Sequence, residues 1–332
     1  MTSHDLNVLL ARYPAIVRPL DEPETLGNAG GWSGARLWRF TTGLGPMVAR
    51  AWPPDGPDRP ALRQIHATLA EARGLGFVPV PERDRFGETI QESGGRLCDV
   101  SPWMPGAADR DRPPSRPKLH AAFAGLAAFH RAVGGRATRG PSPGLRARLG
   151  EIEALIRDGF AALRRAVERA EGDAYRESAL CWLALAERSA PACIDPLRRA
   201  LALRPRLQPC LRDARPEHFL FDGDRLTGLI DFGAMGLEVV SADLARLMSE
   251  WLGPDRLARV EALDAYAAVR PLDEAESSLI DAFESSAAVL GAGHWVRWHF
   301  LEGRTFDDPE AVSRGIVRGL ERLSWRAIER KA

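Results

Sequence analysis

The sequence predicts an α+β protein in which a small antiparallel β lobe precedes a large, mostly helical lobe. The first hundred residues are rich in glycine, proline and short apolar runs, whereas apolar residues recur at helical spacing through most of the remainder. Between these parts lies a segment rich in proline and arginine, "PGAADRDRPPSRP". We therefore expect lobes at 1–104 and 118–332, joined by a linker at 105–117.

The N-terminal lobe is predicted to hold two hairpins and one helix. Alternation over 27–40 and a short apolar run over 45–52 predict the first hairpin, which turns near Gly43. Apolar residues at helical spacing, with a proline near the start and a glycine at the end, predict a helix over 59–76. The segment 88–104 has two adjacent glycines near its middle and predicts the second hairpin.

The C-terminal lobe is predicted to be helical except for one polar hairpin. Within 208–236, the short β runs "HFLF" and "LTGLI" flank an acidic turn, "DGD". Helical spacing covers seven segments: 118–134, 147–172, 174–203, 241–252, 254–268, 273–302 and 308–330.

Composition disfavours several classes of protein. The 332-residue chain carries 45 basic and 45 acidic residues, a balance that argues against a nucleic-acid binder. It shows no basic, apolar leader at its start and no apolar run of about 18 residues, so we expect a cytoplasmic protein without a membrane span. The cysteines are far apart, without a C-x-x-C pair, and we expect buried free thiols at Cys98, Cys181, Cys193 and Cys210.

Three polar residues in the predicted hairpin point to phosphoryl transfer. This reaction needs a carboxylate near the attacking hydroxyl and ligands for a metal ion that holds the phosphates. Asp213 follows an arginine at the end of an apolar run, His218 comes five positions later, and Asp231 begins an Asp-Phe-Gly. A hairpin brings its two ends together, so all three can face one site. A lone Asp-Phe-Gly is more often only a polar strand end before a glycine turn.

The stretch "LRDARPEHFLFDGDRLTGLIDFG" resembles the catalytic segment of the aminoglycoside phosphotransferase and choline kinase family, H-G-D-x-H-x-x-N followed by a β run and I-D-F/W. The resemblance implies a two-lobed protein-kinase-like fold and ATP-dependent phosphorylation of a hydroxyl on a small molecule. It implies that Asp213 is the catalytic base. It also implies that Asp231 and His218 are ligands of Mg²⁺, with Mn²⁺ as an alternative, and that Asp243 anchors the following helix.

Weaker resemblances place a nucleotide in the N-terminal lobe. "GGWSGARLWRF" resembles the family's phosphate-covering loop, G-G-x-S-N, and "MVARAW" resembles the strand that carries its phosphate-binding lysine. "CDVSPWMPG" resembles the segment that reads adenine through backbone groups. The residues implied to bind nucleotide are Gly30, Gly31, Ser33, Gly34, Arg50, Val100, Ser101 and Trp103.

The chain departs from the family pattern at functional positions. His218 replaces the metal-binding asparagine, Leu211 the histidine of H-G-D, and Arg50 the lysine. The histidine can ligate a metal, but a buried, hydrogen-bonded histidine without a metal is an equally open interpretation. Arginine can bind phosphate through two N–H groups, so Arg50 can replace the lysine, although it can also simply face solvent. No glutamate stands at the expected partner position on the next helix, where Gln64 and Glu71 are the nearby candidates.

Two interpretations of the whole chain therefore stay open. One is an active small-molecule kinase. The other is a catalytically impaired pseudokinase that binds nucleotide or acts as a scaffold, which these substitutions favour and the joint presence of Asp213 and Asp231 opposes. A protein kinase is disfavoured because no A-P-E segment follows Asp231.

Two tryptophans in the predicted helix 273–302 are a weaker signal. Trp295 and Trp298 share one helical face, which indicates core packing or, less often, an aromatic wall for a cationic substrate.

Overall fold

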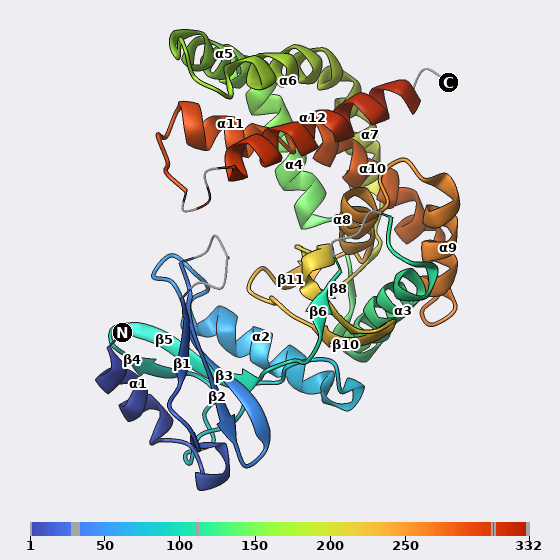
Figure 1. Cartoon of the computed structure of the whole chain (residues 1–332). Helices are drawn as coiled ribbons and strands as arrows, with labels where there is room; N and C mark the ends of the chain where they lie inside the picture. The colour runs from blue at the N-terminus through green and yellow to red at the C-terminus, as the bar shows by residue number, and fades with distance from the viewer. Residues whose placement is uncertain (1, 28–33, 110–112, 307, 309, 330–332) are drawn as a thin grey trace. The chain divides into compact units, whose positions relative to one another are not determined.

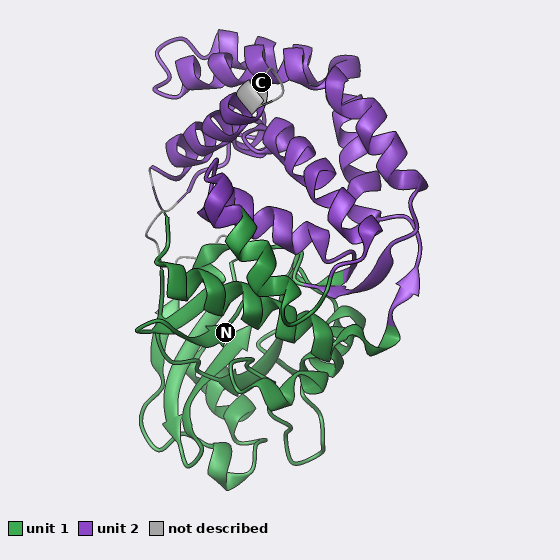
Figure 2. Ribbon diagram, turned by 90° about the vertical axis from the view of Figure 1, so that its right-hand side faces the viewer, with its two compact units in different colours: residues 1–136, 211–236, 260–271 green, residues 137–210, 237–259, 272–332 purple. Residues whose placement is uncertain are grey.

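The computed structural model describes residues 2–27, 34–109, 113–306, 308 and 310–329. The chain forms two compact units, which Figure 2 shows in two colours. The first comprises residues 1–136, 211–236 and 260–271, and the second comprises residues 137–210, 237–259 and 272–332. The first unit therefore contains both the N-terminal β-rich segment and the predicted catalytic hairpin. The expected linker at 105–117 stays a prediction.

A five-stranded antiparallel sheet dominates the N-terminal part of the first unit, with the order β1-β2-β3-β5-β4 (Figure 1). The predicted hairpins form its centre and one edge. Its strands are β1 (Glu24–Gly27), β2 (Arg36–Thr42), β3 (Gly45–Ala51), β4 (Gln91–Ser93) and β5 (Arg96–Pro102). In β3, Arg50 pairs with Leu37 on one side and with Asp99 on the other.

Two helices belong to this part of the unit. The helix α2 (Arg59–Glu71) begins where Asp58 accepts a hydrogen bond from the Ala61 N–H and buries its apolar face. The helix α1 (Ser3–Leu10), beside β4, was not predicted, although Thr2 and Asp5 form a capping box at its start. Its leucines join the sheet in one apolar core, where each buried leucine contributes about 1.5–3 kcal/mol.

The rest of the first unit is built around a smaller antiparallel sheet of order β10-β9-β6. Its strands are β6 (Ala107–Ala108), β9 (Phe219–Asp222) and β10 (Arg225–Leu229), and α3 (Arg116–Ala132) packs on β10. The strands β9 and β10 are the predicted polar hairpin. Gly106 enters β6 with a φ of +95°, in close contact with the backbone of Phe221.

The second unit is mainly helical. Its small sheet has the order β11-β8-β7. The elements are β7 (Thr138–Arg139), β8 (Arg206–Cys210), β11 (Gly236–Glu238), α4 (Pro143–Ala154), a π-helical turn (Leu155–Gly159), α5 (Phe160–Arg169), α6 (Arg176–Ser189), α7 (Pro191–Ala202), α8 (Ser241–Trp251), α10 (Glu274–Leu290), α11 (Gly293–Phe300) and α12 (Ala311–Glu329). The helix α9 (Arg256–Ala267) begins in this unit and ends in the first.

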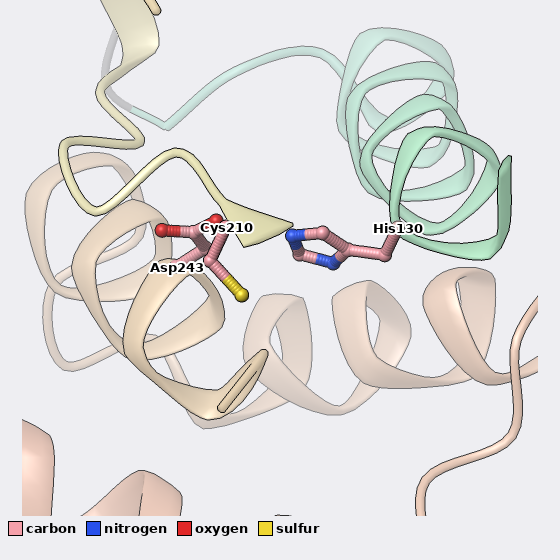
Figure 3. A group of neighbouring side chains, drawn as sticks. All are labelled: His130, Cys210 and Asp243. Carbon is pink, nitrogen blue, oxygen red and sulfur yellow. The ribbon is translucent and has the colours of Figure 1, made fainter. Parts of the chain in front are cut away.

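Two buried carboxylates lie at the starts of helices in the second unit. Glu238 accepts hydrogen bonds of 2.6 Å from the Ser142 hydroxyl and the Gly144 N–H, which satisfies donors at the start of α4. Asp243 is fully buried in the first turn of α8, and Cys210 ends β8 in the same unit (Figure 3). The helical boundaries differ from the expected ones at two places, because Pro191 separates α6 from α7 and Gly291 separates α10 from α11.

None of the described helices combines the length and the apolar run that a bilayer crossing requires.

Not all of the cysteines are buried, and cysteine labelling tests which of them are. Cys98, Cys193 and Cys210 are buried as expected, but Cys181 is exposed on α6. Burial raises the pKa of the Cys98 thiol to about 12, so almost no reactive thiolate forms at that residue near pH 8. Iodoacetamide should therefore alkylate Cys181 in the native protein and Cys98 only after unfolding, as read by mass spectrometry. Equal native labelling of both thiols would contradict this structure.

Replacing Gly106 by alanine should destabilise the first unit. A methyl group there would lie 2.5 Å from the Thr227 hydroxyl oxygen and 2.6 Å from the Phe221 carbonyl oxygen, at a backbone angle unfavourable to alanine. We expect a loss of about 2–4 kcal/mol in the free energy of unfolding, measured by urea denaturation. The control is Gly135→Ala, since no neighbouring atom lies within 4 Å of that added methyl group. Equal stability of the two variants would refute the close approach.

Candidate active site

The site is built on the turn that follows β8. Leu211 is buried, and the chain then passes through Arg212, whose φ is +64°, before it reaches Asp213. A short 3₁₀ turn, Pro216–His218, leads into β9. Asp213 is about one-third exposed, and its Oδ1 accepts a 2.9 Å hydrogen bond from the Nε of Arg215. The carboxylate is therefore oriented by a guanidinium while part of it stays accessible.

His218 links the two aspartates of the site. Its ring is buried, its Nδ1 lies 2.9 Å from the backbone oxygen of Asp213, and its Nε2 lies 3.5 Å from Oδ2 of Asp231. A carbonyl oxygen can only accept, so Nδ1 must carry the hydrogen of this bond. In the neutral ring the lone pair is then on Nε2, the nitrogen that faces Asp231. Hydrogen bonds of this kind commonly orient histidines that bind metals.

Asp231 is placed by the polar hairpin. The Ile230 N–H donates to the His218 carbonyl oxygen at 2.9 Å, so the two ends of the hairpin lie side by side. Asp231 itself has a φ of +63°, a left-handed conformation that aspartate tolerates better than most residues. Its side chain is 55% exposed. An exposed carboxylate beside a buried, oriented imidazole can accept a ligand from solvent.

These two residues fit a divalent cation. Ligands at about 2.0–2.2 Å from one ion lie roughly 3–3.5 Å from each other, which matches the spacing of Nε2 and Oδ2. A carboxylate suits Mg²⁺ or Mn²⁺, whereas the imidazole nitrogen is a softer donor than the amide oxygen of asparagine. The donor set can therefore hold a cation, with a weaker preference for Mg²⁺ than an all-oxygen set has.

Arg50 lies in β3, half-buried, with its guanidinium carbon 4.7 Å from the centre of the Trp52 ring. Neither expected helix partner pairs with it, because Gln64 is exposed and Glu71 lies 3.8 Å from Arg136. Within the described parts of the chain, Arg50 forms no ion pair. A half-buried guanidinium without a carboxylate partner is suited to an external anion.

The residues implied to bind nucleotide are only partly described. Gly30, Gly31 and Ser33 lie outside the described residues. Gly34 has a φ of +69°, and its carbonyl oxygen accepts a hydrogen bond from Arg96 at 3.1 Å. The carbonyl oxygen of Val100 accepts from the Glu82 N–H at 2.8 Å, and the Trp103 N–H donates to Pro46 at 3.0 Å. These two backbone groups therefore already form hydrogen bonds within the protein. Ser101, which lies between them in the sequence, is buried.

Comparison with known proteins shows the family of the chain. The sequence pattern of the phosphotransferase enzyme family (APH) matches residues 24–276. The chain belongs to this family. No curated protein matches it.

Solved structures of similar fold are distant in sequence. An aminoglycoside phosphotransferase from Alicyclobacillus acidocaldarius is 20% identical, with 97% of this chain and 94% of that one covered and a TM-score of 0.64. The amicoumacin kinase hAmiN is 13% identical, with coverages of 95% and 92% and a TM-score of 0.64. A choline/ethanolamine kinase family protein from Mesorhizobium loti is 19% identical, with coverages of 97% and 99% and a TM-score of 0.58. These likenesses confirm the predicted kinase-like α+β fold.

One departure of this phosphotransferase from the family pattern has a visible backbone consequence. Arg212 stands where the family has glycine, and it adopts the left-handed conformation that glycine adopts without strain. For a residue with a side chain, this conformation costs about 1–2 kcal/mol. The Arg212 side chain packs closely over Gly236, where an added methyl group would lie 2.9 Å from its Nη1. Arg212 thus adopts a left-handed conformation at the position where the resembled motif has glycine.

The tryptophans of α11 belong to an aromatic cluster in the second unit. The Trp295 indole lies so close to Gly315 that a methyl group there would be 2.3 Å from it, which places Trp295 in helix packing. Trp298 contacts the ring of Trp295, and the Arg304 guanidinium carbon lies 5.1 Å from the centre of its ring. Trp295 therefore packs between helices of the second unit, although neither tryptophan is fully buried, and the Arg304 side chain of the same chain lies over Trp298.

Sequence reasoning missed two residues of the site. Arg215, which orients Asp213, could have been noticed because it stands two positions after the aspartate on the same turn. No feature of the sequence indicated a role for Trp52, because it looked like the last residue of a buried strand. Its contacts are tertiary and depend on β5 and on the segment after Asp231.

Proposed function

We propose that this phosphotransferase transfers the terminal phosphate of ATP to a hydroxyl group of a small molecule, with a divalent cation bound. The observation that carries the proposal is the position of His218, which contacts the Asp213 backbone through one nitrogen and lies beside the Asp231 carboxylate with the other. One buried ring thus holds the candidate base and the candidate metal ligand in a fixed relation. The family of the chain supplies the reaction class.

Each residue has a definite task in this proposal. Asp213, oriented by Arg215, accepts the proton of the acceptor hydroxyl as that oxygen attacks the phosphorus. Asp231 and His218 would hold the cation, which neutralises charge on the phosphates when bound. Arg50 donates N–H groups to phosphate oxygens in place of the family's lysine. The glycine-rich segment Gly30–Gly34 covers the phosphates, and backbone groups over Val100–Trp103 not already used within the fold contact adenine.

The comparison structures support the choice of nucleotide and cation. The amicoumacin kinase structure contains AMP-PNP, Ca²⁺ and amicoumacin, so a protein of this fold holds a nucleotide, a divalent ion and a small molecule together. The acceptor of this chain is proposed only as a small molecule with a hydroxyl group. A screen of such compounds coupled to ADP release identifies it.

Replacing the two aspartates by asparagine should separate their roles. Asp213→Asn keeps size but removes the proton acceptor, so turnover should fall about 100-fold or more while nucleotide affinity is kept. Asp231→Asn removes negative charge at the cation, so metal-dependent nucleotide affinity itself should fall. ADP release and calorimetric binding of ADP with metal measure the two effects.

The matched control for these variants is Asp222→Asn, which changes an exposed aspartate at the end of β9 in the same hairpin. It should alter neither quantity. If wild-type protein turns over no acceptor in a broad panel and Asp231→Asn binds nucleotide normally, the pseudokinase or scaffold interpretation replaces the kinase.

Restoring the family residue at position 218 should change the metal preference. His218→Asn replaces an imidazole nitrogen by an amide oxygen, which Mg²⁺ prefers. We expect the ratio of Mg²⁺-supported to Mn²⁺-supported turnover to rise by about 10-fold or more, in the range of other metal-site changes. Initial rates with each metal give this ratio. An unchanged ratio would mean that His218 is a structural histidine and not a ligand.

A further inference from the structure

Trp52 lies at the centre of a contact network in the first unit. It is buried directly after β3, and its indole Nε1–H donates to Oδ2 of Asp99 at 2.5 Å. Asp99 is only 4% exposed, and the same oxygen lies 3.6 Å from Nε2 of His66 on α2. The other ring nitrogen of His66 is 2.9 Å from the Thr89 hydroxyl oxygen. The indole is therefore fixed by a buried carboxylate that also contacts α2.

The same indole contacts both halves of the proposed phosphate site. The guanidinium carbon of Arg50 lies 4.7 Å from the centre of the Trp52 ring. Gly233, two residues after Asp231, approaches the ring so closely that a methyl group there would lie 3.1 Å from Cζ3. That methyl position is also 3.6 Å from Oδ1 of Asp231. The ring thus connects the phosphate-binding arginine with the turn that carries the metal ligand.

We propose that Trp52, fixed by Asp99, is the positioning residue that holds Arg50 for phosphate binding, in place of an ion pair with a helix carboxylate. This inference rests on the proposed function. The helix candidates for such an ion pair, Gln64 and Glu71, do not contact Arg50. The connection between Arg50 and α2 is instead indirect. His66 of α2 contacts Asp99, and Asp99 accepts the hydrogen bond of the Trp52 indole.

A stacking partner leaves Arg50 more fully available than an ion pair would. A guanidinium has five N–H donors, whereas its attraction to an indole acts through the face of the aromatic ring and involves no carboxylate acceptor. A carboxylate partner would use one or two of those donors and would neutralise the charge. The cation–π contact with Trp52 thus orients Arg50 while its positive charge is kept for phosphate oxygens.

The test compares nucleotide affinity in Trp52 variants by calorimetry with ADP and Mn²⁺. Trp52→Leu removes the aromatic face and should weaken ADP binding about 5- to 30-fold, the range expected for a partly desolvated cation–π contact. Trp52→Phe keeps a face and should bind with intermediate affinity. In an Arg50→Ala background, Trp52→Leu should have little further effect, because the indole acts through the arginine.

The control is Trp38→Leu, which removes an indole of the same sheet that is buried to the same degree, 7% exposed against 8% for Trp52. It should lower stability while ADP affinity stays unchanged. If Trp52→Leu does not fold, Trp52→Phe carries the same test: it should weaken ADP binding in the wild-type background and have little effect in the Arg50→Ala background.

The outcomes separate this inference from the proposed function. If wild-type protein binds ADP and Trp52→Leu binds it equally well, or if the effects of Trp52→Leu and Arg50→Ala simply add, the positioning role is wrong and the kinase proposal stands. If wild-type protein binds no ADP with any divalent cation, the kinase proposal fails, and the role of Trp52 fails with it.

Discussion

The hydrogen bond between Nδ1 of His218 and the backbone oxygen of Asp213 is the interaction on which the site depends. It fixes the ring, places the lone pair of the neutral imidazole on Nε2, and aims that nitrogen at the Asp231 carboxylate. The β9–β10 hairpin closes the same arrangement through the backbone, since the Ile230 N–H donates to His218 itself. The proposed proton acceptor and the proposed metal ligands thus lie next to one another in one hydrogen-bonded segment.

The substitutions in this phosphotransferase form a consistent set. In the proposed site, arginine takes the place of lysine at the phosphate, and its support comes from an aromatic ring in place of a carboxylate. In the same proposal, histidine takes the place of asparagine at the cation, with its tautomer set by a backbone carbonyl. Arg212, at the position of the glycine in the resembled motif, has a left-handed backbone. Under the proposed function, Arg50 and His218 each have a partner that orients them, which favours an adapted site over a decayed one.

Sequence reasoning succeeded where the determinants were local. The hairpins over 27–52 and 88–104 follow from strand alternation and glycine turns, and the spacing from Asp213 to Asp231 matched a known segment. Sequence reasoning failed where apolar residues keep their helical spacing across the end of a helix. It predicted one helix over 273–302, where the structure has α10 and α11. The Trp52–Asp99 bond joins residues 47 positions apart, so no local pattern could have indicated it.

The most direct test of the site is a crystal structure with ADP and Mn²⁺, in which anomalous scattering locates the metal. We predict a manganese peak within about 2.0–2.4 Å of both His218 Nε2 and an Asp231 oxygen, with the Arg50 guanidinium in contact with the phosphates. A nucleotide bound with its metal elsewhere, or with Nε2 of His218 paired to Asp231 and no metal between them, would contradict the account.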